Sequence, residues 1–348
     1  MPDLYIDSFK LACPKGEDGL EVFKTYIENI ISMRDLLNVS WLGIYISAKL
    51  PDVLAETDSY PPWKDVRKAI DYLQFQDIDP SDIFYVIDQL LEGVTVIEDR
   101  FGIDDILIDN YQSVPSYHYA ERLPPFIENY QDFASKICFC CHLNDLQSSD
   151  PYFLTDNLRD EDKNICVKSE ILDCDFVDSP CCVEFPIIVK GTFSAANNID
   201  DFRLRIDPIT IWRHAEDDES YRAAIDIYIH QKADKQGIEE ENRISVSWSF
   251  GSKFINSLKR LKFLNKDEEI DKLLRALAEV ILNENLQSTH HLRVGKGGDD
   301  PQRIREQDNA KAWRRDIDRK FHLHYWQTSD EIEFAWASYP HDDFYIPE

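Results

Sequence analysis

The sequence has 348 residues and a formal net charge of −28, with 66 acidic and 38 basic side chains. A hydrophobic content of 43% is enough for a folded core, and the 11 glycines and 16 prolines follow no period, which excludes collagen-like and low-complexity classes. The charge is uneven, because residues 1–250 carry −26 and residues 251–348 only −2. Repulsion of phosphate backbones therefore applies mainly to the first 250 residues.

Neither a secretory leader nor a membrane span is predicted, because no cationic start precedes an apolar run and no 18-residue window is apolar and uncharged. We therefore expect a cytoplasmic protein that does not contact a membrane. The eight cysteines contain a single Cys-x-x-Cys spacing, Cys138 to Cys141, and no second pair to complete a structural zinc site, so we interpret Cys138, Cys140 and Cys141 as buried thiols. No phosphate loop or dinucleotide-binding motif occurs, and we expect no metal and no cofactor.

Apolar periodicity in the first part of the chain predicts helices and one buried strand. The segment Asp79-Pro80-Ser81-Asp82 supplies an N-cap, a proline suited to a first helical turn and a carboxylate favoured there. A strand is expected over residues 41–50, and helices over residues 20–37, 63–73, 81–91 and 124–142.

Strand signals dominate the middle of the chain, where residues 164–194 are rich in Val, Ile and Phe and residues 202–213 alternate. A helix is expected over 219–231 and another strand over 243–250. The last part predicts two helices (253–263 and 268–284) and a hairpin of two strands (321–326 and 331–338). This mixture predicts an α+β fold. We expect three regions: 1–145, 146–251, and a C-terminal domain over 252–348 with two helices packed on an antiparallel sheet.

The chain turns positive only between residues 290 and 320, which hold nine basic and six acidic side chains. A glycine-rich loop, Val294 to Gly298, carries Lys296, and Trp313-Arg314-Arg315 leads toward the hairpin. The order of elements over residues 266–348 resembles the RelE/YoeB-type ribonuclease toxins. The matching pieces are the helix ending near Asn285, His291-Leu292, the glycine loop, Trp313 to Ile317, Phe321 to Tyr325, and His341 with Tyr339 or Tyr345.

The resemblance implies RNA cleavage through the 2′-hydroxyl without a metal, on free or ribosome-bound RNA. That chemistry needs a base, an acid and a cation at the phosphate. The implied catalytic residues are Arg314, Arg315, His324 and His341, and the implied nucleic-acid-binding residues are His291, Arg293, Lys296, Arg303, Arg305 and Arg319. The alternative interpretation is structural. Arg314 and Arg315 would pair with Asp316, Asp318 and neighbouring carboxylates, while one of His322 and His324 would pack inward.

Two functions from different classes remain open. The first is a bacterial toxin-like or antiviral effector whose C-terminal domain cuts RNA under the control of the acidic region. The second is a non-catalytic subunit of a protein complex that uses the same domain to bind a partner or nucleic acid. Aromatic residues form 12% of the chain, and such residues are frequent at interfaces.

Overall fold

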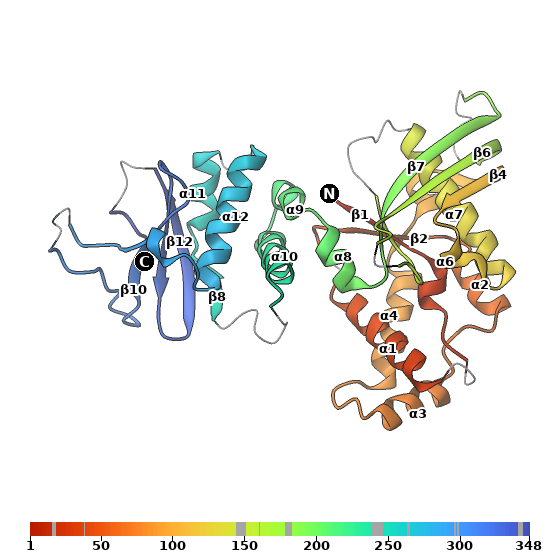
Figure 1. Ribbon diagram of the computed structural model, residues 1–348, viewed down its shortest axis with the longest axis horizontal. Coiled ribbons are helices and arrows are strands. Elements are labelled where there is room, and N and C mark those ends of the chain that lie inside the picture. The colour runs from red at the N-terminus through yellow and green to blue at the C-terminus, as the bar shows by residue number, and fades with distance from the viewer. Residues whose placement is uncertain are drawn as a thin grey trace. The chain divides into compact units, whose positions relative to one another are not determined.

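A computed structural model describes residues 1–15, 19–37, 39–143, 151–159, 161–177, 183–238, 246–262, 265–295, 297, 299–339 and 344–348 (Figure 1). The chain forms two compact units, Met1–Ile206 (unit 1) and Asp207–Glu348 (unit 2). Both combine helices with a mixed sheet, so the α+β class is confirmed. The division differs from the three expected regions, because the strands between residues 152 and 196 join the sheet of the N-terminal region.

Unit 1 is built on a seven-stranded sheet. In spatial order its strands are β3 (Thr95–Val96), β2 (Gly43–Ile46), β1 (Asp3–Ile6), β5 (Tyr152–Leu154), β7 (Ile187–Ala196), β6 (Asn164–Phe176) and β4 (Ile103–Val114). The first five are parallel, whereas β6 is antiparallel to both of its neighbours. All four residues of β1 are buried, as is usual for a central parallel strand covered on both faces.

The helices of unit 1 cover this sheet and pack on one another (Figure 1). They are α1 (Leu20–Arg34), α2 (Leu50–Glu56), α3 (Trp63–Leu73), α4 (Pro80–Glu92), α5 (Ile97–Phe101), α6 (Tyr117–Ala120), α7 (Pro124–Leu143) and α8 (Ile199–Arg205), with a short 3-10 turn over Ser8–Leu11. Helix α7 lies against β4, β6 and β7, and its Phe133, Ile137 and Phe139 enter the main core.

The start of α4 confirms the capping signal in the sequence. The Asp79 carboxylate accepts a bond from the Ser81 backbone N–H at 2.9 Å, and the Asp82 carboxylate accepts one from the Asp79 N–H at 2.8 Å. By contrast, the strand expected over residues 202–213 is wrong. This segment forms parts of two helices, because Asp207 caps the second one through the N–H groups of Ile209 and Thr210.

Unit 2 contains a five-stranded sheet and four α-helices within its described residues. The elements are α9 (Pro208–His214), α10 (Asp218–Gln236), β8 (Ser247–Phe250), α11 (Phe254–Leu261), α12 (Asp267–Ile281), a 3-10 turn (Leu286–Ser288), β9 (Thr289–His291), β10 (Lys311–Asp316), β11 (His322–Gln327) and β12 (Glu331–Ser338). The strand order is β8-β12-β11-β10-β9.

The unit 2 sheet is mixed, which corrects the expectation of an antiparallel sheet. Strand β8 runs parallel to β12, because two helices separate β8 from the rest of the sheet in the sequence. Helix α11 packs against β12 and α12 against β10, on one face of the sheet (Figure 1). Helices α9 and α10 also belong to the unit, with α10 packed on α12, so two helices do not describe it fully.

Candidate active site

Alternation along β10 sorts its side chains onto the two faces of the unit 2 sheet. Trp313 and Arg315 face α12, so Arg314 and Asp316 lie on the opposite face. Strand register places His324 beside Arg314 and His322 beside Asp316, while His290 of β9 lies on the other side of Arg314. The face opposite α12 therefore gathers three imidazoles, a guanidinium and a carboxylate.

Three of these side chains, His290, Arg314 and His322, lie near the Asp316 carboxylate, and we call the four residues the Asp316 cluster. One carboxylate oxygen lies 2.9 Å from His322 Nδ1 and 3.8 Å from Arg314 Nε. The other lies 3.7 Å from His290 Nε2. Their exposures differ, with 47% of the His290 side chain, 36% of Asp316, 29% of Arg314 and 10% of His322 accessible to solvent.

This arrangement has the groups that metal-free RNA cleavage needs. The carboxylate orients the His322 ring by accepting from Nδ1–H when that nitrogen carries the proton, which leaves proton transfer to Nε2. His290 supplies a second imidazole. Arg314 supplies a guanidinium, the side chain best matched to a phosphate. The cluster thus combines two groups able to move protons with one cation for the developing charge.

Arg315, by contrast, is a buried structural residue. Only 1% of its side chain is exposed, and its guanidinium pairs with the Glu279 carboxylate and donates to the Asn285 carbonyl at 2.6 Å and to Thr289 Oγ1 at 3.1 Å. A side chain held in this way cannot reach a scissile phosphate. The structure therefore does not support a catalytic Arg315, and its carboxylate partner is Glu279 of α12 and not the expected Asp316 or Asp318.

His324 is buried as well. Its ring lies 2.7 Å through Nδ1 from the Tyr345 carbonyl and 3.3 Å through Nε2 from Ser338 Oγ. Because the carbonyl can only accept, Nδ1 carries the proton, and Nε2 accepts from the Ser338 hydroxyl. Burial lowers the pKa of His324 to about 4. His324 therefore fastens the segment over residues 344–348 to the sheet, and its expected role in proton transfer is withdrawn.

The expected nucleic-acid-binding residues are spread over several environments. Arg305 is held between Asp308 and Glu333, and Arg293 donates to the Asp300 carbonyl at 2.7 Å. Arg303 is half-buried in the connection before β10, and His291 is exposed on β9 with its ring 4.7 Å from that of Trp313. Arg319 is exposed and lines a pocket beside β10. Lys296 and His341 lie outside the described residues.

Sequence reasoning named Asp316 as a structural partner of Arg314, but it missed His290 and His322 as members of the same cluster. The signal was present, because Arg314 and Asp316 are two residues apart on a strand, as are His322 and His324. Pairing Asp316 with His322 across the connection to the next strand would have brought the four together. His290 needed long-range information, because its strand joins the sheet from about 20 residues upstream.

Unit 1 holds a second polar group, located where its central parallel strands end. Asp7 follows β1 and Thr155 follows β5. The Thr155 hydroxyl donates to Asp7 at 2.6 Å, and Arg122 donates to Asp7 at 2.6 Å and to Thr155 at 3.0 Å. Ligands of open α/β sheets often bind at such strand ends. Here all three side chains are buried and bonded to one another, so the group stabilises the fold.

No disulfide joins the described cysteines, and Cys13, Cys138 and Cys140 are buried. Burial raises the pKa of Cys13 to about 12 and the pKa values of Cys138 and Cys140 further. Cys181 and Cys182 lie outside the described residues. Within the described part of the chain, no group of three His, Cys, Asp or Glu side chains is arranged to hold a metal ion. No helix there is long and apolar enough to cross a membrane.

In comparisons with known proteins, no protein family model, curated protein or solved structure matches the chain.

Proposed function

We propose that unit 2 binds RNA and cleaves it through the 2′-hydroxyl without a metal ion, as part of a bacterial toxin-like or antiviral effector. The observation that carries the proposal is the Asp316 carboxylate, which has two imidazoles and a guanidinium within 3.8 Å. The resemblance of residues 266–348 to RelE/YoeB-type toxins supports the same chemistry. The excess negative charge of the first 250 residues favours a role in restraining that activity.

In this mechanism His322 takes the proton from the 2′-hydroxyl, and O2′ attacks phosphorus. The bond from phosphorus to O5′ then breaks, and His290 gives a proton to the leaving oxygen. Arg314 binds the non-bridging oxygens as their charge grows. The products are a 2′,3′-cyclic phosphate and a free 5′-hydroxyl.

The test uses the purified full-length protein and a fluorophore–quencher RNA in a buffer with EDTA. We expect cleavage that leaves 2′,3′-cyclic phosphate ends. His322→Ala should lower the rate by about 10²–10⁴-fold, and Arg314→Ala by about 10²–10³-fold. His214→Ala is the matched control, because His214 is an exposed histidine of α9 outside the cluster. RNA that stays intact, or variants as fast as wild type, would refute the proposal.

A second candidate function is RNA or partner binding without catalysis. The burial of Arg315 and His324, both implied by the family resemblance to be catalytic, favours it. In that case Arg314→Ala and His322→Ala weaken association while RNA is never cut. Gel shift and cleavage assays on the same samples separate the two functions.

A further inference from the structure

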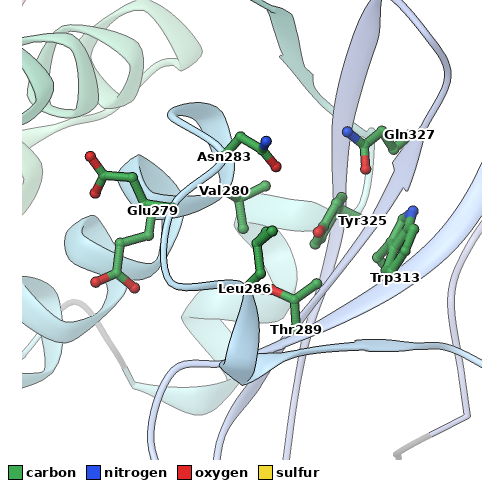
Figure 2. A pocket seen from close by; sticks show the side chains of 9 residues that line it. Glu279, Val280, Asn283, Leu286, Thr289, Trp313, Tyr325 and Gln327 are labelled. Carbon is green, nitrogen blue, oxygen red and sulfur yellow. The ribbon is translucent and has the colours of Figure 1, made fainter.

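A second site lies on the other face of the same strands. A pocket of about 230 Å³ opens between the end of α12 and strands β10 and β11. Figure 2 shows Trp313 and Tyr325 side by side on neighbouring strands, with Val280 and Leu286 across the opening. Leu286 is 59% exposed, so the pocket is accessible from solvent. Its walls are therefore an aromatic pair on one side and two aliphatic side chains on the other.

The rim of this pocket is polar and rich in hydrogen-bond acceptors. Asn283 and Gln327 present amides, and Glu279, Glu284 and Thr289 complete the lining (Figure 2). Flat aromatic walls bind nucleobases by stacking, and amides and carboxylates read the edges of bases. Glu279 and Glu284 each pair with a cation through Oε2, so Oε1 of each carboxylate and the amide carbonyls of Asn283 and Gln327 remain as acceptors. These acceptors favour the amino group of cytosine or adenine over the O4 carbonyl of uracil.

A cationic pocket of about 380 Å³ lies alongside and shares Glu279 with the first. Lys272, Arg275 and Arg319 line it, and none of them forms an ion pair within the described part of the chain. The lining acids are engaged elsewhere: Glu279 with Arg315, Asp316 with its cluster, and Asp318 with the backbone N–H groups of Lys320 and Phe321. This pocket is therefore suited to an anion such as a backbone phosphate.

We infer that the pocket of Figure 2 binds one unpaired, amino-bearing base of single-stranded RNA, with a neighbouring phosphate on Lys272, Arg275 and Arg319. This inference rests on the proposed function and specifies its substrate. Strand β9 has only three residues and forms the edge of the sheet between the two faces. An RNA strand can pass over this edge, with its base in the pocket and its next phosphates near His290 and Arg314.

The test measures binding of 2′-O-methylated oligo(C) and oligo(U), which cannot be cleaved through the 2′-hydroxyl, to the full-length protein by fluorescence anisotropy. The bases of the two oligomers have rings of the same size, and cytosine carries an amino group at the position where uracil has a carbonyl. We expect oligo(C) to bind about tenfold more tightly. Trp313→Ala should weaken oligo(C) binding by about 10- to 100-fold through loss of a stack. Trp63→Ala, at an exposed tryptophan of unit 1, should have no effect.

Two further variants keep the inference testable if Trp313→Ala fails to fold. Asn283→Leu combined with Gln327→Leu removes two amide acceptors, so it should reduce the preference for oligo(C) and retain stacking. Neutralising Lys272, Arg275 and Arg319 to Gln should reduce the slope of log affinity against log salt by about 0.7 for each phosphate that the protein no longer neutralises. Equal affinity for oligo(C) and oligo(U), or wild-type binding by both the Trp313 and the double amide variants, would overturn the inference.

The outcomes also separate this inference from cleavage. If binding depends on Trp313 while unmethylated RNA stays intact, the binding site stands and the proposed cleavage fails. If RNA is cut but the pocket variants bind normally, cleavage stands and the pocket is not the base site.

Discussion

Arg315 of β10 and Glu279 of α12 form a buried ion pair that joins the unit 2 sheet to the helix covering it. The same guanidinium also donates to the carbonyls of Glu284 and Asn285, which follow the helix. One side chain thus holds the strand, the helix and the chain segment leading to β9. Arg315 therefore holds Glu279, which lines both pockets on this face.

Arg315→Met should strongly destabilise unit 2. The change leaves the Glu279 carboxylate and two backbone carbonyls without their donor, and breaking a buried pair costs about 3–5 kcal/mol. Urea unfolding followed by tryptophan fluorescence measures it, because five of the seven tryptophans lie in unit 2. Arg319→Met is the control, with an expected change within about 0.5 kcal/mol. A similar loss of unfolding free energy in the two variants would contradict the structural role of Arg315.

Acid should destabilise unit 2 through His324. The pKa of this histidine is about 4 in the folded protein, against about 6.5 in an unfolded chain. Between these values the unfolded state binds the proton first, so stability falls as the pH drops from 6.5 and levels off below 4, with a total loss of about 3 kcal/mol. His324→Asn keeps a donor and an acceptor but cannot titrate. Unfolding curves at pH 7 and pH 4 should show a smaller difference for this variant, and an identical difference would refute the prediction.

Asp316→Asn should slow RNA cleavage if the proposed mechanism is correct. The amide can donate to His322 Nδ1 and thereby favour the wrong tautomer for a base acting through Nε2. We expect kcat to fall by about 10²–10⁴-fold, as for loss of a positioned base, with KM nearly unchanged. Steady-state kinetics on the labelled RNA measure both constants. An unchanged kcat would mean that the carboxylate does not position the ring.

Arg122→Leu should destabilise unit 1. The substitution leaves the Asp7 carboxylate buried with only the Thr155 hydroxyl as a side-chain partner, and the expected loss is about 3–5 kcal/mol. Thermal unfolding followed by circular dichroism measures it. Arg159→Leu is a suitable control, because Arg159 is exposed and its guanidinium lies over the Tyr117 ring. Comparable melting temperatures for the two variants would show that the network contributes little.

Ile346→Ala should loosen the segment over residues 344–348. Ile346 is buried with Trp326, whose indole N–H donates to the Pro347 carbonyl at 2.8 Å. Removing a buried Ile side chain costs about 2–5 kcal/mol. Ile304→Ala, at an isoleucine that is 54% exposed in the same unit, should change stability little. We expect a red shift of tryptophan emission at lower urea concentration for the Ile346 variant only.

Local signals in the sequence predicted local structure well. Helix α3 and strand β12 begin and end as expected, because their apolar periods are regular and their flanking residues favour turns. The strand prediction over residues 202–213 failed because alternating apolar residues also suit two short helices, the second of which begins at Pro208. The parallel pairing of β8 with β12 depends on contacts between distant residues, which no local pattern encodes.

The candidate site was predictable only in part, for the same reason. Arg314 was identified from its setting beside Trp313, but burial distinguishes it from Arg315, and burial depends on how α12 packs against the sheet. The sequence does not show which of the two histidines of β11, His322 or His324, is buried. In the folded unit the segment over residues 344–348 covers His324.

The parallel pairing of β8 with β12 also affects the order in which unit 2 can form during synthesis. Strand β8 emerges about 80 residues before its partner Glu331–Ser338. At translation rates of roughly 5–20 residues per second, β8 with its aromatic side chains Trp248 and Phe250 is synthesised about 4–16 seconds before β12. In that interval the nascent chain carries an unpaired, aromatic strand that a chaperone can bind.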